Sequence, residues 1–370
     1  MSSADVVIVG GGVIGLTTAY YCARAGLRVT LVEAGPIGRQ ASWAGAGILP
    51  PASLTYAQTP MDRLRALSNA EYPRLTAQLA EDTGLDNGYR VCGGIELVEP
   101  GQSVHRVPTE EWYSPGARCE MLQGPALQQR LSGWSLAAEI NGGAWLPEMA
   151  QVRNPWHLRA LQAACRVRGV DLRPHWPVRR LLAEGVEGEE GVLRAERIVL
   201  TSGAWTAQLI PIPIRPVRGQ MLLLRIPAGN RPILTCGKRY LVPRGDGRLL
   251  VGSTEEDVGF DASTTAEALS ELRQFAVSLC PALADAPIEG SWAGLRPASA
   301  DGVPYLGPVP GQSRWYVAAG HFRAGLHLSP GTALYLCRLF LGQPEPFDAE
   351  AFRLEPRRYE YRGRHYRPPV

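Results

Sequence analysis

A glycine-rich turn between a short apolar run and a helical pattern restricts the fold of this chain more than any other feature. Residues 5–9 form an apolar run typical of a buried parallel strand, and they lead directly into a GxGxxG sequence that ends at Gly15. We expect Gly10 to make a tight turn, Gly12 to let backbone amides approach a pyrophosphate, and Gly15 to let the next helix pack close to the strand.

The residues after this turn complete the pattern. A helix is expected from Gly15 to about Ala25, with its N-terminus directed at the phosphates, where free N–H groups and the helix dipole favour negative charge. Gly26 ends that helix, and a second strand over residues 28–32 leads to Glu33. A carboxylate at this position can accept hydrogen bonds from the ribose hydroxyls of an adenosine. Together these elements predict a dinucleotide-binding site.

The same stretch has two other interpretations. One is a glycine-rich turn in an unrelated α/β core, and the other is a membrane span or signal peptide, because residues 6–23 are largely apolar. The glycines cluster instead of scattering, no cationic region precedes the stretch, and no A-x-A cleavage pattern follows it. We therefore expect no membrane span.

Composition and charge are those of an ordinary globular protein. The 370 residues suffice for two cores, and a net charge of +3 is too small to suggest a nucleic-acid partner. The basic cluster between Arg357 and Arg367 is interpreted as a solvated or docked terminus. The seven cysteines form no CxxC pair and are odd in number, which is typical of a reducing cytoplasm without a disulfide framework. We predict a cytoplasmic protein with no metal site.

A second segment rich in small residues, 38–49, favours flavin over nicotinamide as the redox ring. Its small side chains let the backbone pass close to a flat ring and a pyrophosphate, and Ser42 can reach a phosphate oxygen. A flexible surface loop is the alternative, although Trp43 and Ile48 would be unusual there.

Two further units of strand and glycine turn lie far along the chain. Residues 197–205 suggest a buried strand closing on a small-residue turn, and residues 315–326 repeat strand, turn and helix. The last helix is expected to continue from about Ser329 to Leu341. Three such units separated by long segments predict an α/β fold with a Rossmann-like domain interrupted by insertions.

The inserted segments are expected to build a second domain. Residues 61–81 have a helical pattern, and residues 217–224, 239–244 and 248–254 have strand patterns, the last two joined by a glycine-rich hairpin. We expect a mixed sheet that covers the flavin. The predicted division gives 1–50, about 146–213 and about 291–345 to the dinucleotide domain, about 51–145 and about 214–290 to the second domain, and 346–370 to a C-terminal tail.

Six segments carry a resemblance to one family. They are RQASWAGAGILPP (39–51), AQVRNPWHLRAL (150–161), PVRGQMLLLR (216–225), RYLVPRGDGRLLVGSTEEDVGFD (239–261), WAGLRPASADGVPYLGP (292–308) and AAGHFRAGLHLSP (318–330). With these segments the chain resembles the D-amino-acid oxidase and sarcosine oxidase group of flavoproteins, and within it the glycine oxidases of thiamine biosynthesis. The resemblance implies a GR2-type FAD-binding Rossmann-like domain with an inserted mixed α+β substrate domain.

The resemblance also implies a set of cofactor contacts. The main chain near Val178 is expected to touch the adenine, and the run from His321 to His327 is expected to surround the isoalloxazine. Ala298, Ser299 and Ala300 stand where sarcosine oxidases carry the cysteine that links their flavin, so non-covalent FAD is expected. The predicted cofactor-binding residues are Gly10, Gly12, Val13, Ile14, Gly15, Glu33, Ala34, Ala41, Ser42, Ala46, Gly47, Ile48, Val178, Gly203, His321, Phe322, Arg323, Ala324, Gly325, Leu326 and His327.

Three residues are predicted to bind the substrate. Arg296 and Tyr240 match the pair that fixes the substrate carboxylate in the family, and Arg323 matches a second arginine beside the ring. A guanidinium presents a fork of donors that fits a carboxylate, and a tyrosine hydroxyl adds a directional donor. The alternatives are a surface ion pair for Arg296, a core position for Tyr240, and a hydrogen bond to flavin or a backbone carbonyl for Arg323.

The roles of three other residues stay open. Glu255 matches a substrate-facing position, where a carboxylate either orients the substrate ammonium or is simply solvated. His321 and His327 flank the flavin turn and are candidate acid–base groups, although we interpret His321 as structural.

The resemblance implies oxidative deamination of glycine. Hydride passes to FAD, O2 reoxidises the flavin and gives H2O2, and the imine yields glyoxylate and ammonia or passes to a thiazole-forming partner. The alternatives are an oxidase or dehydrogenase of sarcosine, another N-substituted glycine or a D-amino acid, and, from another class, a flavoprotein of RNA modification or electron transfer. The family also suggests a homo-oligomer such as a tetramer.

Overall fold

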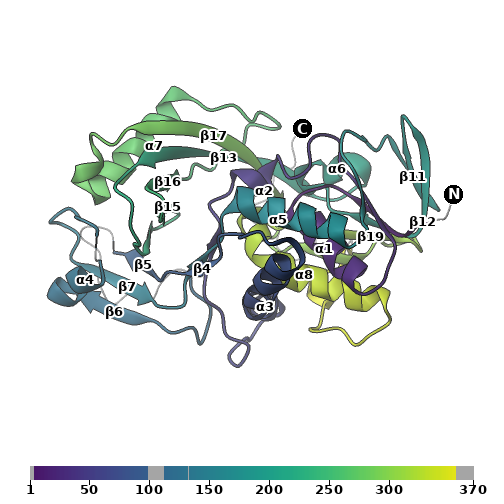
Figure 1. The fold of residues 1–370 in the computed structure, drawn as a ribbon, viewed down its shortest axis with the longest axis horizontal. Coiled ribbons are helices and arrows are strands. Elements are labelled where there is room, and N and C mark those ends of the chain that lie inside the picture. The colour runs from purple at the N-terminus through teal and green to yellow at the C-terminus, as the bar shows by residue number, and fades with distance from the viewer. Residues whose placement is uncertain (1–3, 99–111, 132, 356–370) are drawn as a thin grey trace.

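The computed structural model describes residues 4–98, 112–131 and 133–355. The basic cluster from Arg357 to Arg367 and the end of the predicted tail lie outside these residues. Two large sheets lie side by side, and helices pack around the first of them (Figure 1). The long strands β13 and β17 of the second sheet reach towards the first.

The first sheet is the predicted Rossmann-like sheet. Its central strands run in the order β19-β12-β1-β2-β9 and are all parallel, and antiparallel strands complete it at β18 and at the β10–β11 hairpin. The strands are β1 (Ala4–Val9), β2 (Val29–Val32), β9 (Asp171–Arg173), β10 (Arg180–Leu182), β11 (Gly185–Gly188), β12 (Gly191–Leu200), β18 (Tyr305–Pro308) and β19 (Trp315–Ala319). The three distant strand-and-turn units therefore meet in one sheet, as predicted.

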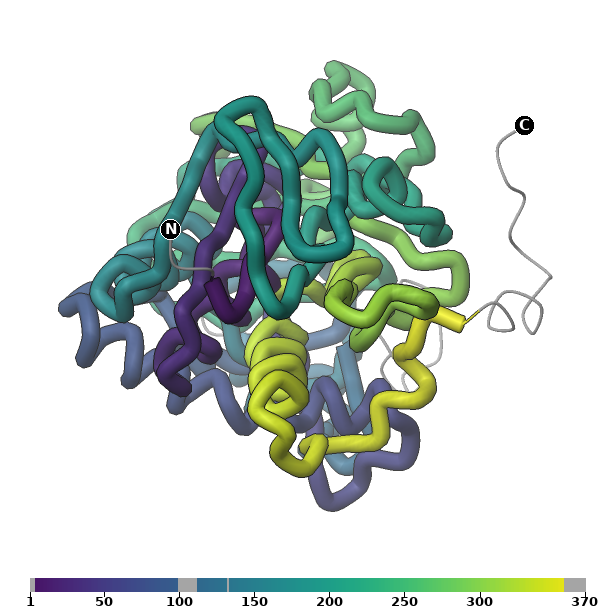
Figure 2. The backbone as a smooth tube through the Cα atoms, turned by 90° about the vertical axis from the view of Figure 1, so that its right-hand side faces the viewer, coloured from purple at the N-terminus to yellow at the C-terminus, as the bar shows by residue number. Residues whose placement is uncertain are grey.

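Four helices and this sheet share one core, in which α1 and α8 lie against each other. Figure 2 shows α8 in yellow beneath the teal hairpin at the edge of the sheet. Helix α3 starts at a capping box, in which the side chain of Thr59 accepts from the backbone N–H of Asp62. It ends at Gly84, which has a φ of +68°. The helices are α1 (Val13–Arg24), α3 (Pro60–Thr83), α5 (Asn154–Val167) and α8 (Gly325–Phe340).

Helix α8 runs through a proline. The sequence pattern predicts a helix in the third strand-and-turn unit that continues from about Ser329, and Pro330 inside α8 has no N–H to donate. The carbonyl of Leu326, which the N–H of residue 330 would otherwise reach, instead accepts from the hydroxyls of Tyr72 and Ser329. Tertiary packing thus replaces the missing backbone bond and lets the helix start at Gly325.

The second sheet is mixed, as predicted. Its order is β17-β13-β16-β15-β14-β5-β7-β6, and only the β14–β5 pair is parallel among these described strands. Its strands are β5 (Gly94–Leu97), β6 (Glu120–Gln123), β7 (Gly142–Leu146), β13 (Ile214–Arg225), β14 (Ile233–Cys236), β15 (Arg239–Arg244), β16 (Arg248–Gly252) and β17 (Ile288–Ser299). Helix α7 (Ala266–Leu279) packs Leu272 and Ala276 on the apolar face of this sheet.

Short elements complete the fold. A small antiparallel sheet joins β3 (Ile48–Leu49), β8 (Ala150–Gln151) and β4 (Arg90–Val91). The remaining helices are α2 (Ala41–Ala44), α4 (Gly124–Arg130) and α6 (Thr206–Leu209), with 3-10 turns η1 (Gly203–Trp205), η2 (Pro281–Leu283), η3 (Phe322–Ala324) and η4 (Glu350–Phe352).

Two elements lie across the division of domains drawn from the sequence. Strand β17 pairs with β13 on both sides of residue 291, and α3 packs its Leu64, Leu75 and Leu79 into the core of the first sheet. No helix within the described ranges has the length and apolar character needed to cross a membrane.

Candidate active site

A cavity of about 900 Å³ lies where the carboxyl ends of the first sheet face the second sheet. Residues at the ends of β1, β2, β12 and β19 line one side, and residues of β13, β15 and β17 line the other. Ligands of open α/β sheets bind outside the carboxyl ends of the strands, and this volume is at the upper end of the range of roughly 300–1,000 Å³ for cofactor sites. The cavity is therefore large enough for a dinucleotide.

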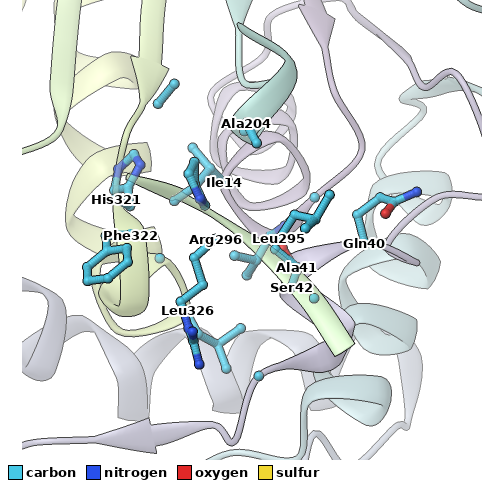
Figure 3. Close-up of a pocket in the computed structure, with 18 of the residues that line it drawn as sticks. Ile14, Gln40, Ala41, Ser42, Ala204, Leu295, Arg296, His321, Phe322 and Leu326 are labelled. Atoms are coloured by element: carbon cyan, nitrogen blue, oxygen red, sulfur yellow. The ribbon is translucent and has the colours of Figure 1, made fainter. Parts of the chain in front are cut away.

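The cavity gathers every predicted site residue except Gly15. It is lined by Gly10, Gly12, Val13, Ile14, Glu33, Ala34, Ala41, Ser42, Ala46, Gly47, Ile48, Val178, Gly203, Tyr240, Arg296, His321, Phe322, Arg323, Ala324, Gly325, Leu326 and His327. In the view of Figure 3, Arg296 is drawn between Phe322 on one side and Ala41 and Ser42 on the other, and all of them line the cavity.

Gly15 does not line the cavity and lies behind the residues that do. A Cβ at Gly15 would lie 2.0 Å from the carbonyl oxygen of Gly10 and 2.7 Å from Oγ1 of Thr201. Gly10 itself has φ of +115°, which favours glycine. The two glycines together let α1 start directly against the turn.

The N-terminus of α1 is suited to bind an anion. No side chain caps it through the usual N-cap position and no acidic residue lies in its first turn, so N–H groups of the first turn remain for a ligand. The N–H of Val13 is bonded to Oγ of Ser42, 2.9 Å away, which leaves the Ser42 hydroxyl hydrogen available to a phosphate oxygen.

The acid after β2 is held in a fixed orientation. Oε2 of Glu33 accepts from the N–H of Gly11 at 2.7 Å, and Oε1 accepts from the N–H of Gly35 at 3.1 Å. Each carboxylate oxygen has a further lone pair, so ribose hydroxyls can still donate to it.

The loop from residue 40 to 49 is fastened by an asparagine that the sequence interpretation missed. Nδ2 of Asn154 donates to the carbonyl of Ser42 at 2.8 Å, and Gly47, with φ of +73°, comes so close to Val152 that a Cβ would lie 2.0 Å from its carbonyl oxygen. Oδ1 of Asn154 is buried beside the cavity with no partner among the described residues. The sequence signal for it was weak, since asparagine at a helix start usually only caps the helix.

The turn, the acid and the loop together fit FAD. The N–H groups left at the start of α1 and the hydroxyl of Ser42 suit the pyrophosphate, and Glu33 suits the ribose. The small side chains of Ala46 and Gly47 let the backbone approach a flat ring.

Arg296 is the strongest candidate for a substrate-binding group. Its Nη2 donates to Oγ of Ser253 at 2.6 Å, and its Nη1 donates to the carbonyls of Thr254 at 3.0 Å and Arg218 at 3.4 Å. Burial lowers the pKa of its guanidinium, and no carboxylate of the described residues forms an ion pair with it. These bonds use three of the five N–H donors, so donors remain for a ligand carboxylate.

Tyr240 lines the same end of the cavity. Its side chain is buried, its ring meets Trp112 edge-on, and its hydroxyl lies 3.4 Å from Sδ of Met221. A thioether is a weak acceptor, so the hydroxyl can readily turn to donate to a carboxylate.

An ion network around the buried Arg218 holds the segment that positions Arg296. The guanidinium of Arg218 pairs with the carboxylates of Glu256 and Asp261, and the backbones of Arg218 and Glu256 exchange hydrogen bonds of 2.9 and 3.0 Å. This fixes the chain at Ser253 and Thr254, which supply the acceptors for Arg296. Sequence patterns could not show this network, because it joins residues of β13 to the loop after β16.

Arg323 lies among other charged groups at the same end. Its Nη2 donates to the carbonyl of Lys238 at 2.8 Å, and its Nη1 lies 3.9 Å from Oε2 of Glu255. Nζ of Lys238 lies 3.5 Å from the same oxygen. The sequence interpretation did not identify Lys238, which lies in the short turn between β14 and β15.

The two histidines of the flavin turn are buried and bonded. Nε2 of His321 lies 3.1 Å from Oγ1 of Thr332, and Nε2 of His327 lies 2.5 Å from Oδ1 of Asn69. Burial lowers the pKa of both imidazoles to about 3, so both rings are neutral at physiological pH. This favours a structural role over proton transfer.

A third buried histidine, His157, should make the stability of the protein depend on pH. Burial lowers its pKa to about 4, against about 6.5 in the unfolded chain. Between these values only the unfolded chain binds the proton, so stability present above pH 6.5 is lost as the pH falls towards 4. His157→Gln should therefore flatten the dependence of the unfolding free energy on pH between 5 and 6 by at most about 1.4 kcal/mol per pH unit. Urea unfolding at several pH values measures this dependence. Equal slopes of the unfolding free energy against pH in the two proteins between pH 5 and 6 would contradict the prediction. Between pH 7 and 8 the two slopes should be the same.

Known proteins are similar to this chain in sequence and in fold. The profile of the family described as FAD dependent oxidoreductase matches residues 5–339. The chain is 37% identical over 360 residues to a protein named glycine oxidase from Pseudomonas aeruginosa, covering 94% of this chain and 97% of that one. It is also 37% identical over 353 residues to the bifunctional protein ThiO/ThiG of Nostoc sp., covering 92% of this chain and 53% of that longer protein.

A solved structure agrees over almost the whole length. The crystal structure of glycine oxidase from Geobacillus kaustophilus matches with a TM-score of 0.87 and 31% identity, covering 96% of this chain and 99% of that one. The strand order, the cavity and these matches point to the same family. The chain belongs to the FAD-dependent oxidoreductases.

Proposed function

We propose that this protein is a glycine oxidase, which oxidises the amine of glycine and passes the electrons through FAD to O2. The observation that carries the proposal is Arg296, a partly buried guanidinium at the end of the cavity bounded by residues 321–327, with donors left for a small carboxylate. The similarity to proteins named glycine oxidase supports the choice of glycine.

The residues that would hold FAD follow from the cavity. The N-terminus of α1 and Ser42 would hold the pyrophosphate, Glu33 the ribose, Val178 the adenine, and the 321–327 turn the ring. When bound, FAD supplies a two-electron acceptor for the amine. We also propose that the first sheet with its helices forms the FAD domain and the second sheet the substrate domain.

The protein's own residues bind and orient the amino acid. Arg296 and Tyr240 would hold its carboxylate, which fixes the position of the carbon that carries the amine. His321 and His327 have low pKa values and are already bonded, so neither would serve as the base, and the substrate ammonium would lose its proton to water before oxidation. Water then hydrolyses the imine product to glyoxylate and ammonia, and O2 is reduced to H2O2.

The biological setting is also a proposal. Similarity to ThiO/ThiG supports a role in thiamine thiazole synthesis, in which the imine would pass to a thiazole-forming partner. We also propose a cytoplasmic homo-oligomer, as the family resemblance implies.

An amine panel under anaerobic and aerobic conditions tests the function. Glycine mixed anaerobically should bleach the flavin absorbance, and admission of O2 should restore it with formation of H2O2. Sarcosine and small D-amino acids define the competing substrates. The proposal fails if glycine leaves the flavin oxidised while a large D-amino acid reduces it quickly, and the oxidase assignment fails if only a quinone or dye restores the absorbance.

We expect the protein to release intact FAD on mild acid or heat denaturation. Ala298, Ser299 and Ala300 offer no thiol for a covalent link near the substrate arginine. Absorbance of the supernatant and of the precipitated chain measures the distribution of flavin. Flavin that stays with the precipitate would show a covalent bond elsewhere.

A further inference from the structure

Arg244, the last residue of β15, holds the loop of residues 40–49 from behind the cavity. Its Nη2 donates to the carbonyl of Ala46 at 2.7 Å, and its Nη1 donates to Oε1 of Gln151 at 2.5 Å and to the carbonyl of Val152 at 3.3 Å. Ala46 lines the cavity, whereas Arg244 is only 5% exposed and lies outside the described lining. One side chain of the second sheet therefore fixes a backbone carbonyl at the cavity.

The guanidinium of Arg244 forms no ion pair with any described residue. Its three acceptors are neutral oxygens, and the carboxylate of Asp246 pairs with Arg153 and Arg248 instead. Burial, with a smaller contribution from Arg153, lowers the pKa of Arg244 to about 9, so the group is still cationic at neutral pH. A buried charge is costly unless an opposite charge compensates it. Negative charge on a ligand in the cavity would supply that compensation.

Gly47, the next residue of the loop, is buried, and its N–H has no acceptor among the described residues. Its carbonyl accepts from the N–H of Val152 at 2.8 Å. A Cβ on Gly47 would lie 2.0 Å from the carbonyl oxygen of Val152, so this side of the glycine is closed by protein. Buried backbone N–H groups are nearly always bonded, so this one indicates an acceptor that a ligand supplies.

The bond from Arg244 sets the direction of this N–H. The peptide between Ala46 and Gly47 is trans, and in a planar trans peptide the carbonyl and the N–H point in opposite directions. Since the carbonyl of Ala46 points at Arg244, the N–H of Gly47 points away from it. Both Ala46 and Gly47 line the cavity, so the N–H faces the space that a cofactor would fill.

We propose that Arg244 is a positioning residue for the flavin ring. It holds the 46–47 peptide so that the N–H of Gly47 donates to the ring, and its charge polarises the peptide and strengthens that donor. A flavin ring gains negative charge when two electrons reduce it, and a nearby cation with an aimed donor favours the charged form. Arg244 therefore favours reduced over oxidised FAD. This inference rests on the proposed placement of FAD and not on glycine as the substrate.

The alternative is that Arg244 only braces the loop against the second sheet. A brace would change the stability of the protein and its affinity for FAD, but it would affect oxidised and reduced FAD equally. The midpoint potential of the bound flavin depends on the ratio of these two affinities. It therefore separates the two roles.

Arg244→Met removes the charge and keeps an unbranched apolar side chain. Anaerobic reduction in the presence of a reference dye measures the midpoint potential, and titration of the apoprotein measures the dissociation constant of oxidised FAD. Reduced FAD should lose at least about tenfold more affinity than oxidised FAD, which makes the midpoint potential about 30 mV more negative. Arg244→Lys should recover part of this shift, because an ammonium keeps the charge but not the planar fork.

Gln151→Glu separates the effect of charge from that of position. It places a carboxylate beside Nη1 of Arg244 and leaves the Nη2 bond to Ala46 in place. The midpoint potential should again become more negative, whereas the dissociation constant of oxidised FAD should change by no more than about threefold. Gln151 also donates to the carbonyl of Pro243, so thermal unfolding of each apoprotein is used to confirm that the variants are folded.

Arg273 provides a matched control. It too donates to two backbone carbonyls, those of Ala284 and Ala286, and all three residues lie outside the described lining of the cavity. Arg273→Met should therefore keep the midpoint potential and the FAD affinity of the unmodified protein.

The outcomes distinguish this inference from the proposed function. An unchanged midpoint potential in folded Arg244→Met overturns the inference, even if FAD affinity falls. A shift in Arg244→Met that is absent from Gln151→Glu overturns the role of the charge and supports positioning alone. Failure of the unmodified protein to oxidise glycine overturns the proposed function, and the measured potentials still decide the role of Arg244.

Discussion

Arg296→Ala is expected to lower kcat/KM for glycine by a factor of roughly a hundred to several thousand while FAD remains bound. Truncating one partner of a buried charge pair costs about 3–5 kcal/mol, because the other charge is left without compensation. Here the stranded charge would be the glycine carboxylate, and the neighbouring acceptors Ser253 and Thr254 would lose their donor. Peroxide formation at varied glycine concentration measures the loss, and the flavin spectrum measures retention.

Two further substitutions in the second sheet serve as controls for Arg296→Ala. Arg296→Lys should restore only part of the activity, because an ammonium offers a point charge in place of a planar fork. Arg215→Ala removes an exposed arginine of β13 that pairs with Asp257, and it should keep near-native kinetics. Near-native kcat/KM in Arg296→Ala would show that the carboxylate binds elsewhere.

The dinucleotide half of the site was predictable because its determinants are local. The turn, α1, β2 and Glu33 follow one another within about thirty residues, so glycine spacing and apolar runs suffice to order them. The structure adds what spacing cannot show, namely that Glu33 is fixed by the N–H groups of Gly11 and Gly35.

The surroundings of Arg296 were not predictable in the same way. Its acceptors, Ser253 and Thr254, lie more than forty residues away in sequence and reach it only through the pairing of β13 with both β16 and β17. Lys238, Glu255 and Arg323 likewise come together from a turn, a loop and a 3-10 helix. Such contacts depend on strand register, which hydrophobic patterns specify only after the partner strands are known.

Gly15 differs from the other motif glycines in one respect, because it affects the site without lining the cavity. The sequence analysis counted it among the cofactor-binding residues and expected it to let the helix pack close to the strand, and the structure places it between α1 and the Gly10 turn, outside the cavity lining. Its small size decides how closely the helix end approaches the phosphates. A substitution here therefore tests positioning of the helix and not a lost contact.

Gly15→Ala is expected to weaken FAD binding by about thirtyfold or more. The added Cβ would lie 2.0 Å from the carbonyl oxygen of Gly10, which is far inside van der Waals contact, so α1 and the turn must move apart. Overpacking of this kind costs about 1–3 kcal/mol and sometimes more, and 2 kcal/mol is a factor of roughly thirty. Titration of the apoprotein with FAD, followed by quenching of flavin fluorescence, measures the dissociation constant.

A glycine without neighbours provides the control for this substitution. At Gly290 in β17 a Cβ would meet no atom within 4 Å, so Gly290→Ala should bind FAD as the unmodified protein does. Thermal unfolding of both apoproteins shows whether Gly15→Ala remains folded, since a folded variant with weak FAD binding is the expected result. Native affinity in a folded Gly15→Ala variant would mean that α1 can shift without moving its N-terminal N–H groups, and that the close packing of helix and turn is not what places them at the pyrophosphate.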